Sequence, residues 1–232
     1  VSQNKQMYHC FGCGESGNVY TFLMKYENYS FPEAVRVLAD RVGISLPEIE
    51  YSEEQKAKSN YKKRLMDLNK EAATYFYYQL RRNPHGQIGL EYLKKRELSD
   101  DTMNRFGLGF AGKNSRDLVA YLRSKGYEDK EILDAGLASF SEERGMSCLF
   151  WNRVMFPIQD LNKHVIGFGG RVMGDGEPKY LNSPETEVFD KRRNLYGFHF
   201  ARSSRSKYLI LCEGYMDVIS MHQAGFDSAM AS

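Results

Sequence analysis

Two cysteines three residues apart are the first candidates for chemistry, in the segment Cys10-Phe-Gly-Cys13-Gly14. Two thiolates at positions i and i+3 can bind one zinc ion, and a glycine after the second cysteine lets amide groups of the turn face sulfur. A redox pair is the main alternative, but such a pair usually follows a strand and opens a helix. The aromatic-glycine interior and the glycines that follow favour zinc, and a pair without any role is the third interpretation.

A structural zinc site takes four ligands, and this segment supplies two. His9 is adjacent to Cys10, so its side chain would diverge from the same ion. The forty residues after Cys13 contain no further cysteine or histidine. We therefore expect the other two ligands upstream of Val1, and an incomplete zinc site in this chain.

Two carboxylates are the next candidates, in the segment Glu213-Gly-Tyr-Met-Asp217. The apolar run 208–212 predicts a buried strand before them, and 216–224 predicts a helix after it. Open α/β sheets place their sites at the carboxyl ends of strands, where this acid pair could hold Mg²⁺. A helix-capping acid pair is the alternative. Residues 228–232 begin like a second strand, which predicts a βαβ unit that is cut short.

The segment 150–207 carries an excess of positive charge, with ten Lys and Arg against six Asp and Glu, whereas the rest has 22 against 24. Spaced cations with hydrogen-bonding neighbours suit the phosphates of a nucleic acid or of a triphosphate. An ordinary solvated basic surface would show the same pattern, so both interpretations stay open. The candidate phosphate-binding residues are Arg153, Arg171, Lys179, Tyr180, Asn182 and Lys191, with Arg192 and Arg193 beside the last.

The glycine-rich stretch 167–170 is a poor dinucleotide-binding loop, because no helix follows it. We expect these glycines to allow close packing or a bend in a strand. Trp151 and the aromatic cluster 75–78 are predicted core residues, with partial exposure for some tyrosines. Cys148 and Cys212 are predicted to be buried structural thiols.

Apolar spacing and end signals predict the elements that position these residues. Ser30 and Glu33 form a capping box, Gly43 ends the helix that follows, and Ser99 and Ser115 cap two later helices. After Gly145 the pattern changes to two strands joined by a turn at 160–163, and then an irregular loop at 178–186. The expected helices cover 18–28, 31–43, 65–82, 88–95, 99–106, 115–125 and 129–134, and the expected strands cover 107–111, 154–158 and 164–173.

Composition limits the class of protein. The 232 residues are 42% hydrophobic and 27% charged, which allows a sizeable core. No run approaches the length of about 18 apolar residues that a membrane span needs, so we expect no membrane partner. Four scattered cysteines are too few for a disulfide scaffold, which favours a reducing, cytoplasmic setting.

Three segments in this order resemble the bacterial DNA primase family, DnaG type. The first resembles the second half of the family's zinc-binding domain. The second resembles the N-terminal subdomain of its RNA polymerase core, and the third resembles the first strand and helix of its toprim fold. The segments are YHCFGCGESGNVYTFLM (8–24), RVMFPIQDLNKHVIGFGGRVMGDGEPKYLNSPETEVFDKRRNLYG (153–197) and LILCEGYMDVIS (209–220).

The resemblance implies an α+β fold with a truncated zinc-ribbon unit, a mixed α/β N-terminal subdomain of the primase core and the first βα of a toprim fold. The expected bounds are a partial zinc-binding domain at 1–46, a linker at 47–60, the N-terminal subdomain of the core at 61–207 and the start of a toprim domain at 208–232.

The resemblance also implies metals. Family members bind zinc through Cys-x2-His and a later Cys-x2-Cys, and Cys10 and Cys13 match the second pair. Glu213 and Asp217 match the toprim acids that bind catalytic Mg²⁺ or Mn²⁺. The family's Asp-x-Asp pair, which holds most of that metal, would follow Ser232.

Basic residues of the family's template and nucleotide surface match Arg153, Arg171 and Lys191. Where family members commonly have Lys-Gly-Arg, this chain has Lys191-Arg192-Arg193. The extra Arg192 adds a phosphate contact or is a neutral surface change, and the sequence leaves both open.

The implied function is synthesis of short RNA primers on single-stranded DNA from ribonucleoside triphosphates, in the bacterial cytoplasm at the replication fork. The replicative helicase would bind through a C-terminal domain that this chain lacks. The alternative is that the isolated fragment is a catalytically inactive piece that binds single-stranded DNA. A third hypothesis is another toprim enzyme, a topoisomerase or a nuclease. The order of the zinc and RVMFPI motifs argues against it.

Overall fold

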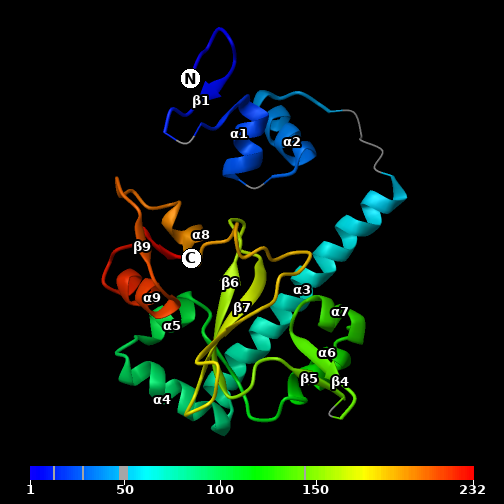
Figure 1. Cartoon of the computed structure of the whole chain (residues 1–232), viewed down its shortest axis with the longest axis vertical. Coiled ribbons are helices and arrows are strands. Elements are labelled where there is room, and N and C mark those ends of the chain that lie inside the picture. The colour runs from blue at the N-terminus through cyan, green and yellow to red at the C-terminus, as the bar shows by residue number, and fades with distance from the viewer. Residues whose placement is uncertain (13, 28, 47–51, 144) are drawn as a thin grey trace. The chain divides into compact units, whose positions relative to one another are not determined.

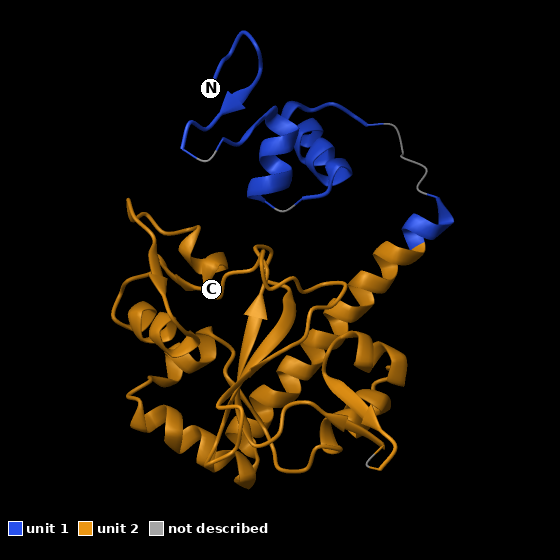
Figure 2. Ribbon diagram, in the orientation of Figure 1, with its two compact units in different colours: residues 1–56 blue, residues 57–232 orange. Residues whose placement is uncertain are grey.

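The computed structural model describes residues 1–12, 14–27, 29–46, 52–143 and 145–232. The chain separates into two units, Val1–Lys56 and Ala57–Ser232 (Figures 1 and 2). The boundary falls inside the long helix α3 (Glu53–Arg82), so residues 53–60 of the predicted linker are helical. Residues 47–51 of that linker lie outside the described residues.

The first unit is a small hairpin followed by two helices. Strands β1 (Tyr8–His9) and β2 (Ser16–Gly17) pair antiparallel, and helices α1 (Val19–Tyr26) and α2 (Phe31–Val42) follow. The predicted capping box at the start of α2 is confirmed, as is its end at a glycine with φ of 68°. Local capping chemistry therefore sets the limits of this helix.

The second unit alternates short helices with short strands (Figure 1). After α3 come η1 (Pro84–Gly86), α4 (Gln87–Lys95), α5 (Asp100–Arg105), β3 (Gly109–Ala111), α6 (Asp117–Ser124), α7 (Asp129–Asp134), β4 (Ala138–Ser141), β5 (Gly145–Cys148), β6 (Arg153–Gln159), β7 (Val165–Val172), β8 (Tyr180–Asn182), α8 (Phe198–Ala201), β9 (Ile210–Cys212), α9 (Tyr215–Gln223) and β10 (Ala229–Ala231).

A four-stranded antiparallel sheet of order β3-β6-β7-β8 organises this unit. Strands β6 and β7 run side by side in Figure 1 as a long hairpin, as the sequence predicted. Asp160 shapes the turn between them, because its Oδ1 accepts the amides of Asn162 and His164 at 2.8 Å each. The side-chain oxygen thus replaces a backbone acceptor in the turn.

Hydrophobic residues bury both faces of this sheet. On one face, Phe76 of α3 packs against Phe168 of β7 with ring centroids 5.4 Å apart. On the other face, Val154, Phe156 and Ile158 of β6 pack against α4, α5 and α9. Six of the seven residues of β6 are buried, which explains why this strand reads as a continuous apolar run.

A second, parallel pair forms the predicted βαβ unit, with Ile210 of β9 opposite Ala229 of β10 and α9 between them. Strand β9 begins two residues later than predicted, and the prediction that it is buried was wrong. Leu211 is 66% exposed. The reason is that within the described residues β9 pairs only with β10, and α9 covers one face of the pair.

Other sequence predictions also need correction. Trp151 is 47% exposed rather than core, because its indole Nε1 donates to the carbonyl of Lys113 at 2.7 Å and its ring lies at the surface. The predicted cap at Ser115 was wrong, because α6 has Arg116 at its N-cap and no side-chain cap there; Asn114 Oδ1 accepts the amide of Arg116. Strand β8 lies within the predicted irregular loop, and the hairpin β4-β5 and helix α8 were missed. Among the described helices, none is long and apolar enough to cross a membrane.

Candidate functional site

The pairing of β7 with β8, the outer ladder of the sheet, brings several predicted residues together. Arg171 of β7 lies opposite Tyr180 of β8, and Gly169 lies opposite Asn182. Side chains of opposite residues leave a sheet on the same face, and alternate residues share a face. Arg171, Tyr180 and Asn182 therefore line one face of the ladder, beside the bare backbone of Gly169.

Aromatic rings hold the guanidinium of Arg171. Its central carbon lies 4.3 Å from the ring centroid of Tyr92 in α4 and 6.0 Å from that of Tyr180. Nη1 donates to the carbonyl of Val172 at 3.4 Å, and Nε is buried without a hydrogen-bond partner. The side chain is thus oriented by cation–π contacts with two tyrosines.

Sequence reasoning missed two residues at this ladder, Tyr92 and Arg96, which lie in and directly after α4. Burial raises the pKa of Tyr180, and the charges of Arg171 and Arg96 oppose that shift, which places Arg96 electrostatically beside the ladder. The run Lys94-Lys95-Arg96 at a helix end was the available signal, but nothing in the sequence placed it next to β8.

Tyr215, from the acid-bearing segment, fills the space above Gly169. A Cβ added at Gly169 would lie 2.4 Å from Tyr215 Cε2, so only glycine allows this approach. The Tyr215 hydroxyl donates to Asn182 Oδ1 at 2.8 Å, and its ring stacks on Phe156 with centroids 5.3 Å apart. Burial raises the pKa of Tyr215 to about 12, so the hydroxyl is a donor at neutral pH.

The other glycines of β7 also make room for side chains, as the sequence predicted. A Cβ at Gly167 would lie 3.1 Å from the ring of Phe189, and one at Gly170 would lie 2.9 Å from the ring of Phe150. The glycine-rich stretch is therefore a packing feature of a strand and not a nucleotide-binding loop.

The two predicted catalytic acids flank Tyr215 along the chain. Glu213 follows β9, Asp217 lies in the first turn of α9, and both are exposed. Because Tyr215 is anchored on the ladder, each acid stands within two residues of that anchor. The charge of Asp217 adds to burial in raising the pKa of Cys212, which is only partly buried.

This acid pair fits part of a magnesium site. Carboxylate oxygens are the ligands that Mg²⁺ prefers, and exposure leaves room for its waters. Within the described ranges there is no cluster of three or more His, Cys, Asp or Glu side chains around a common point. The role of Glu213 and Asp217 as metal ligands stays a prediction from the sequence.

The structure places Arg153 apart from the other phosphate-binding candidates. It is 4% exposed, and Nη1 donates to the carbonyls of Gly170 at 3.1 Å, Pro178 at 2.8 Å and Lys179 at 3.5 Å. Burial lowers the pKa of this guanidinium. Little of the side chain is left for contact with a ligand.

Lys179, directly before β8, and Lys191, after it, are both exposed. Lys191 lies in a turn held by Asp190, whose Oδ1 accepts the amide of Arg192 at 2.9 Å. Arg193 pairs with the same carboxylate at 3.6 Å. Arg192 is exposed as well, so the turn presents cations to solvent.

Of the two predicted zinc-binding cysteines, Cys10 lies in the turn between β1 and β2 of the first unit. Cys10 follows β1, its amide donates to Glu15 at 2.7 Å, and its carbonyl accepts the amide of Gly14 at 2.9 Å. Cys13 lies outside the described residues. The cysteine segment is followed by strand β2 and only then by helix α1. Redox pairs instead lie between a strand and the helix that follows it, so this arrangement is typical of a zinc knuckle.

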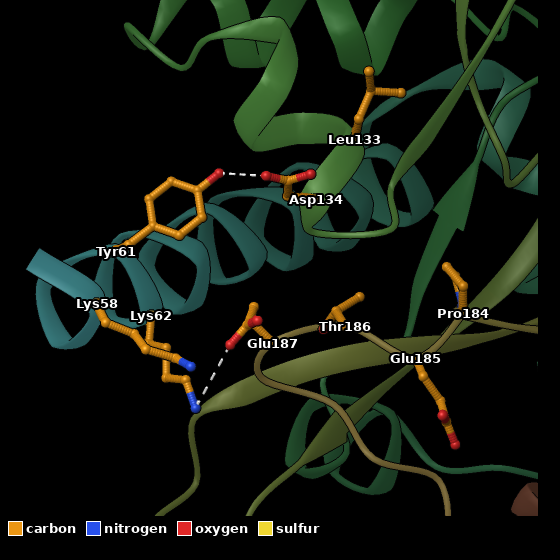
Figure 3. Close-up of a pocket in the computed structure, with 9 residues that line it drawn as sticks. All are labelled: Lys58, Tyr61, Lys62, Leu133, Asp134, Pro184, Glu185, Thr186 and Glu187. Atoms are coloured by element: carbon orange, nitrogen blue, oxygen red, sulfur yellow. Dashed lines mark hydrogen bonds and ion pairs between the residues drawn. The ribbon is translucent and has the colours of Figure 1, made fainter. Parts of the chain in front are cut away.

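A cavity of about 700 Å³ opens elsewhere, between α3, α7 and the loop after β8 (Figure 3). Tyr61 donates to Asp134 at 2.6 Å, and Lys62 pairs with Glu187 at 3.9 Å. None of the predicted site residues lines it, and its charges are of mixed sign. The cavity is therefore distinct from the ladder site.

Two family descriptions match the chain. "CHC2 zinc finger" matches residues 1–56, and "DNA primase catalytic core, N-terminal domain" matches residues 75–202. The first agrees with a zinc-binding hairpin and the second with the mixed α/β sheet unit. A zinc finger joined to a primase core defines the class, and the chain belongs to the DnaG family of bacterial DNA primases.

Related sequences carry the same name. A DNA primase of Clostridium acetobutylicum is 47% identical over the whole of this chain and 38% of its own length. A DNA primase of Pseudomonas putida is 41% identical over the whole chain and 36% of its own length. The chain thus spans about two fifths of the length of the curated relatives it matches.

Solved structures give the same result. The Aquifex aeolicus primase, with zinc-binding and RNA polymerase domains, is 31% identical with a TM-score of 0.66, over 100% of this chain and 55% of that one. The RNA polymerase domain of Mycobacterium tuberculosis primase DnaG, in complex with a double-stranded DNA oligomer with a 6-nucleotide overhang, is 32% identical with a TM-score of 0.70, over 73% of this chain and 54% of that one. A DnaG catalytic domain bound to ssDNA is 37% identical with a TM-score of 0.69, over 75% of this chain and 55% of that one.

Proposed function

We propose that this chain carries the zinc-binding and nucleotide-binding parts of an enzyme that makes short RNA primers on single-stranded DNA. The observation that carries the proposal is the contact of Tyr215 with Gly169 and Asn182. It anchors the acid-bearing segment on the ladder that holds Arg171 and Tyr180. Acids and phosphate-binding side chains are thereby available to one substrate.

The phosphates of the ribonucleotide and of the template would contact the basic side of this ladder. Arg171 is oriented by two rings, and its planar guanidinium is the group that best matches a phosphate. The exposed lysines add point charges. Tyr180 and Asn182 add a ring and an amide for orientation. The proposed set is Arg171, Lys179, Tyr180, Asn182 and Lys191, with Arg96 added.

Glu213 and Asp217 would hold Mg²⁺ or Mn²⁺. Such a metal, when bound, neutralises the triphosphate and favours ionisation of the primer 3′-hydroxyl. The chain's own residues orient the substrate: Arg171 fixes phosphate, and Tyr215 keeps the acid segment in register with it. Any further ligands would come from outside the acid pair.

The first unit would act as a structural zinc domain that helps choose the initiation site on single-stranded DNA. Cys10 and Cys13 would supply two thiolates. The bounds we propose are a zinc-binding part at 1–46, a connection at 47–60, the core subdomain at 61–207 and the start of a toprim domain at 208–232. The helical start at Glu53 makes part of that connection rigid.

The whole protein would bind the replicative helicase through a segment outside this chain and act at the replication fork. The chain alone would bind single-stranded DNA without making primers, which is the second candidate function. What supports it is that the described residues contain no cluster of three or more His, Cys, Asp or Glu side chains that could hold a metal.

Ribonucleotide incorporation on a single-stranded template tests both functions. We expect labelled primers from a protein of the relatives' length and none from the 232-residue chain, which should still shift the template in a gel. Primer synthesis by the chain alone would show that two acids suffice. Lack of synthesis by the longer protein would reject the primase proposal.

A further inference from the structure

Two adjacent residues hold the two ends of the loop that joins β7 to β8. At the start of the loop, Asn152 Nδ2 donates to the carbonyl of Met173 at 2.7 Å, and the amide of Met173 donates back to Asn152 at 2.8 Å. At its end, Arg153 Nη1 donates to the carbonyls of Pro178 and Lys179. The loop is therefore fixed by the first residue of β6 and the residue before it.

Arg153 acts from the far face of the sheet. Val154, its neighbour, lies opposite Arg171, so alternation along β6 puts Arg153 on the other face. The packing of Gly170 agrees, because a Cβ there would lie 3.0 Å from Cδ of Arg153. Arg153 thus lies across the sheet from the ladder face that carries Arg171.

The carbonyls that Arg153 binds belong to the segment leading into β8. The carbonyl of Lys179 also accepts the amide of Val172 at 3.1 Å, which begins the β7-β8 ladder. Tyr180 follows directly, opposite Arg171. A shift of the Pro178–Lys179 backbone would move Lys179 and Tyr180 together.

We propose that Arg153 is a positioning residue, which holds the Pro178–Lys179 backbone from behind the sheet and so sets where Lys179 and Tyr180 meet the nucleotide. The proposal rests on the proposed function, since it takes the ladder to be the nucleotide site. It replaces the expectation that Arg153 itself contacts phosphate. The buried guanidinium has carbonyl partners in place of a carboxylate, and its charge strengthens each of these hydrogen bonds.

Arg153→Lys and Gly170→Ala test this role in two ways. The first keeps the charge but loses the planar donor group. The second keeps the arginine but places a methyl group 3.0 Å from its Cδ and 2.9 Å from the ring of Phe150. Arg123→Lys is the matched control, because Arg123 is an exposed arginine paired with Asp129. All three variants are made in the protein of the relatives' length. Hydrogen exchange is measured without nucleotide.

Amide hydrogen exchange distinguishes positioning from direct contact. In the free protein we expect exchange across 178–182 to rise about tenfold in both variants and to stay unchanged in the control. In primer synthesis we expect KM for ribonucleotides to rise about tenfold while kcat changes less than about threefold.

Unchanged exchange with a raised KM would make Arg153 a phosphate contact and overturn the proposal. Unchanged exchange and KM would overturn it as well, and so would global unfolding of both variants, because the residue would then serve general stability. Failure of the unsubstituted protein to make primers would instead reject the proposed function, while the exchange comparison would still measure the restraint on the loop.

Discussion

Gly169→Ala tests the contact between the acid-bearing segment and the β7-β8 ladder that we propose binds nucleotide. The new methyl group would lie 2.4 Å from Cε2 and 2.7 Å from Cζ of Tyr215. The ring cannot retreat freely, since Phe156 stacks on it at 5.3 Å and Tyr196 meets it edge-on at 4.6 Å. Either β7 or the start of α9 must move.

The free-energy cost follows from two effects. Overpacking a filled site costs about 1–3 kcal/mol. Displacing Tyr215 also breaks its 2.8 Å hydrogen bond to Asn182, which adds about 1 kcal/mol. We therefore expect the free energy of unfolding to fall by about 2–4 kcal/mol, and we expect primer synthesis to fall as well because the acids flanking Tyr215 move relative to Arg171.

Urea denaturation and primer synthesis measure the two effects in the same protein. Gly112→Ala is the control, because a Cβ there would meet nothing within 4 Å. We expect the control to stay within about 1 kcal/mol of the unsubstituted protein. A Gly169→Ala variant as stable as the control would refute the close packing. Normal synthesis by a destabilised variant would refute the link between this contact and catalysis.

Three further changes give sharper tests of single groups. Tyr215→Phe removes the hydroxyl that donates to Asn182, so in steady-state assays KM for ribonucleotides should rise about fivefold, with a loss of stability of about 1 kcal/mol. Arg171→Lys loses the planar contact with aromatic rings, so kcat/KM should fall about tenfold while circular dichroism stays unchanged. Burial, assisted by nearby positive charge, lowers the pKa of His199 from 6.5 to about 4. As the pH is lowered, the unfolded chain therefore binds a proton at this histidine before the folded chain does. The free energy of unfolding should fall by about 1.4 kcal/mol for each pH unit as the pH is lowered from 6.5 to 4. In urea denaturation across this range, His199→Leu should flatten the dependence of the unfolding free energy on pH, and His85→Leu at an exposed histidine should leave that dependence unchanged. An unaltered dependence in His199→Leu would contradict the assignment of this pH effect to His199.

Local chemistry made much of the fold predictable. Ser30 and Glu33 mark the start of α2, and Gly43 marks its end with a positive φ, because these signals depend only on neighbours in the chain. The hairpin β6-β7 was predicted from its apolar runs, which are continuous because both faces are covered.

Long-range packing decided what the sequence could not reveal. Strand β8 has three residues in a polar segment and is a strand only because β7 pairs with it. Trp151 reads as core by type, yet a hydrogen bond to Lys113 holds it at the surface. Short elements and amphipathic residues depend on partners that are distant in sequence.

The sequence predicted which residues belong to the candidate site better than it predicted how they are arranged. Glu213 and Asp217 were singled out from their place after a strand. The residue between them, Tyr215, owes its role to Gly169, which lies 46 residues earlier, and no local pattern reports that contact. Arg153 and Arg171 looked alike in sequence, but register places them on opposite faces of the sheet.

We propose that Glu213 serves catalysis of primer synthesis beside a ladder that binds nucleotide. The most direct test is Glu213→Gln in the protein of the relatives' length, with kcat for primer synthesis and Kd for single-stranded DNA measured on the same preparation. We expect kcat to fall about a thousandfold or more, because the amide is a poor metal ligand, while Kd changes by less than about twofold. Unchanged synthesis, or loss of DNA binding together with synthesis, would contradict the account.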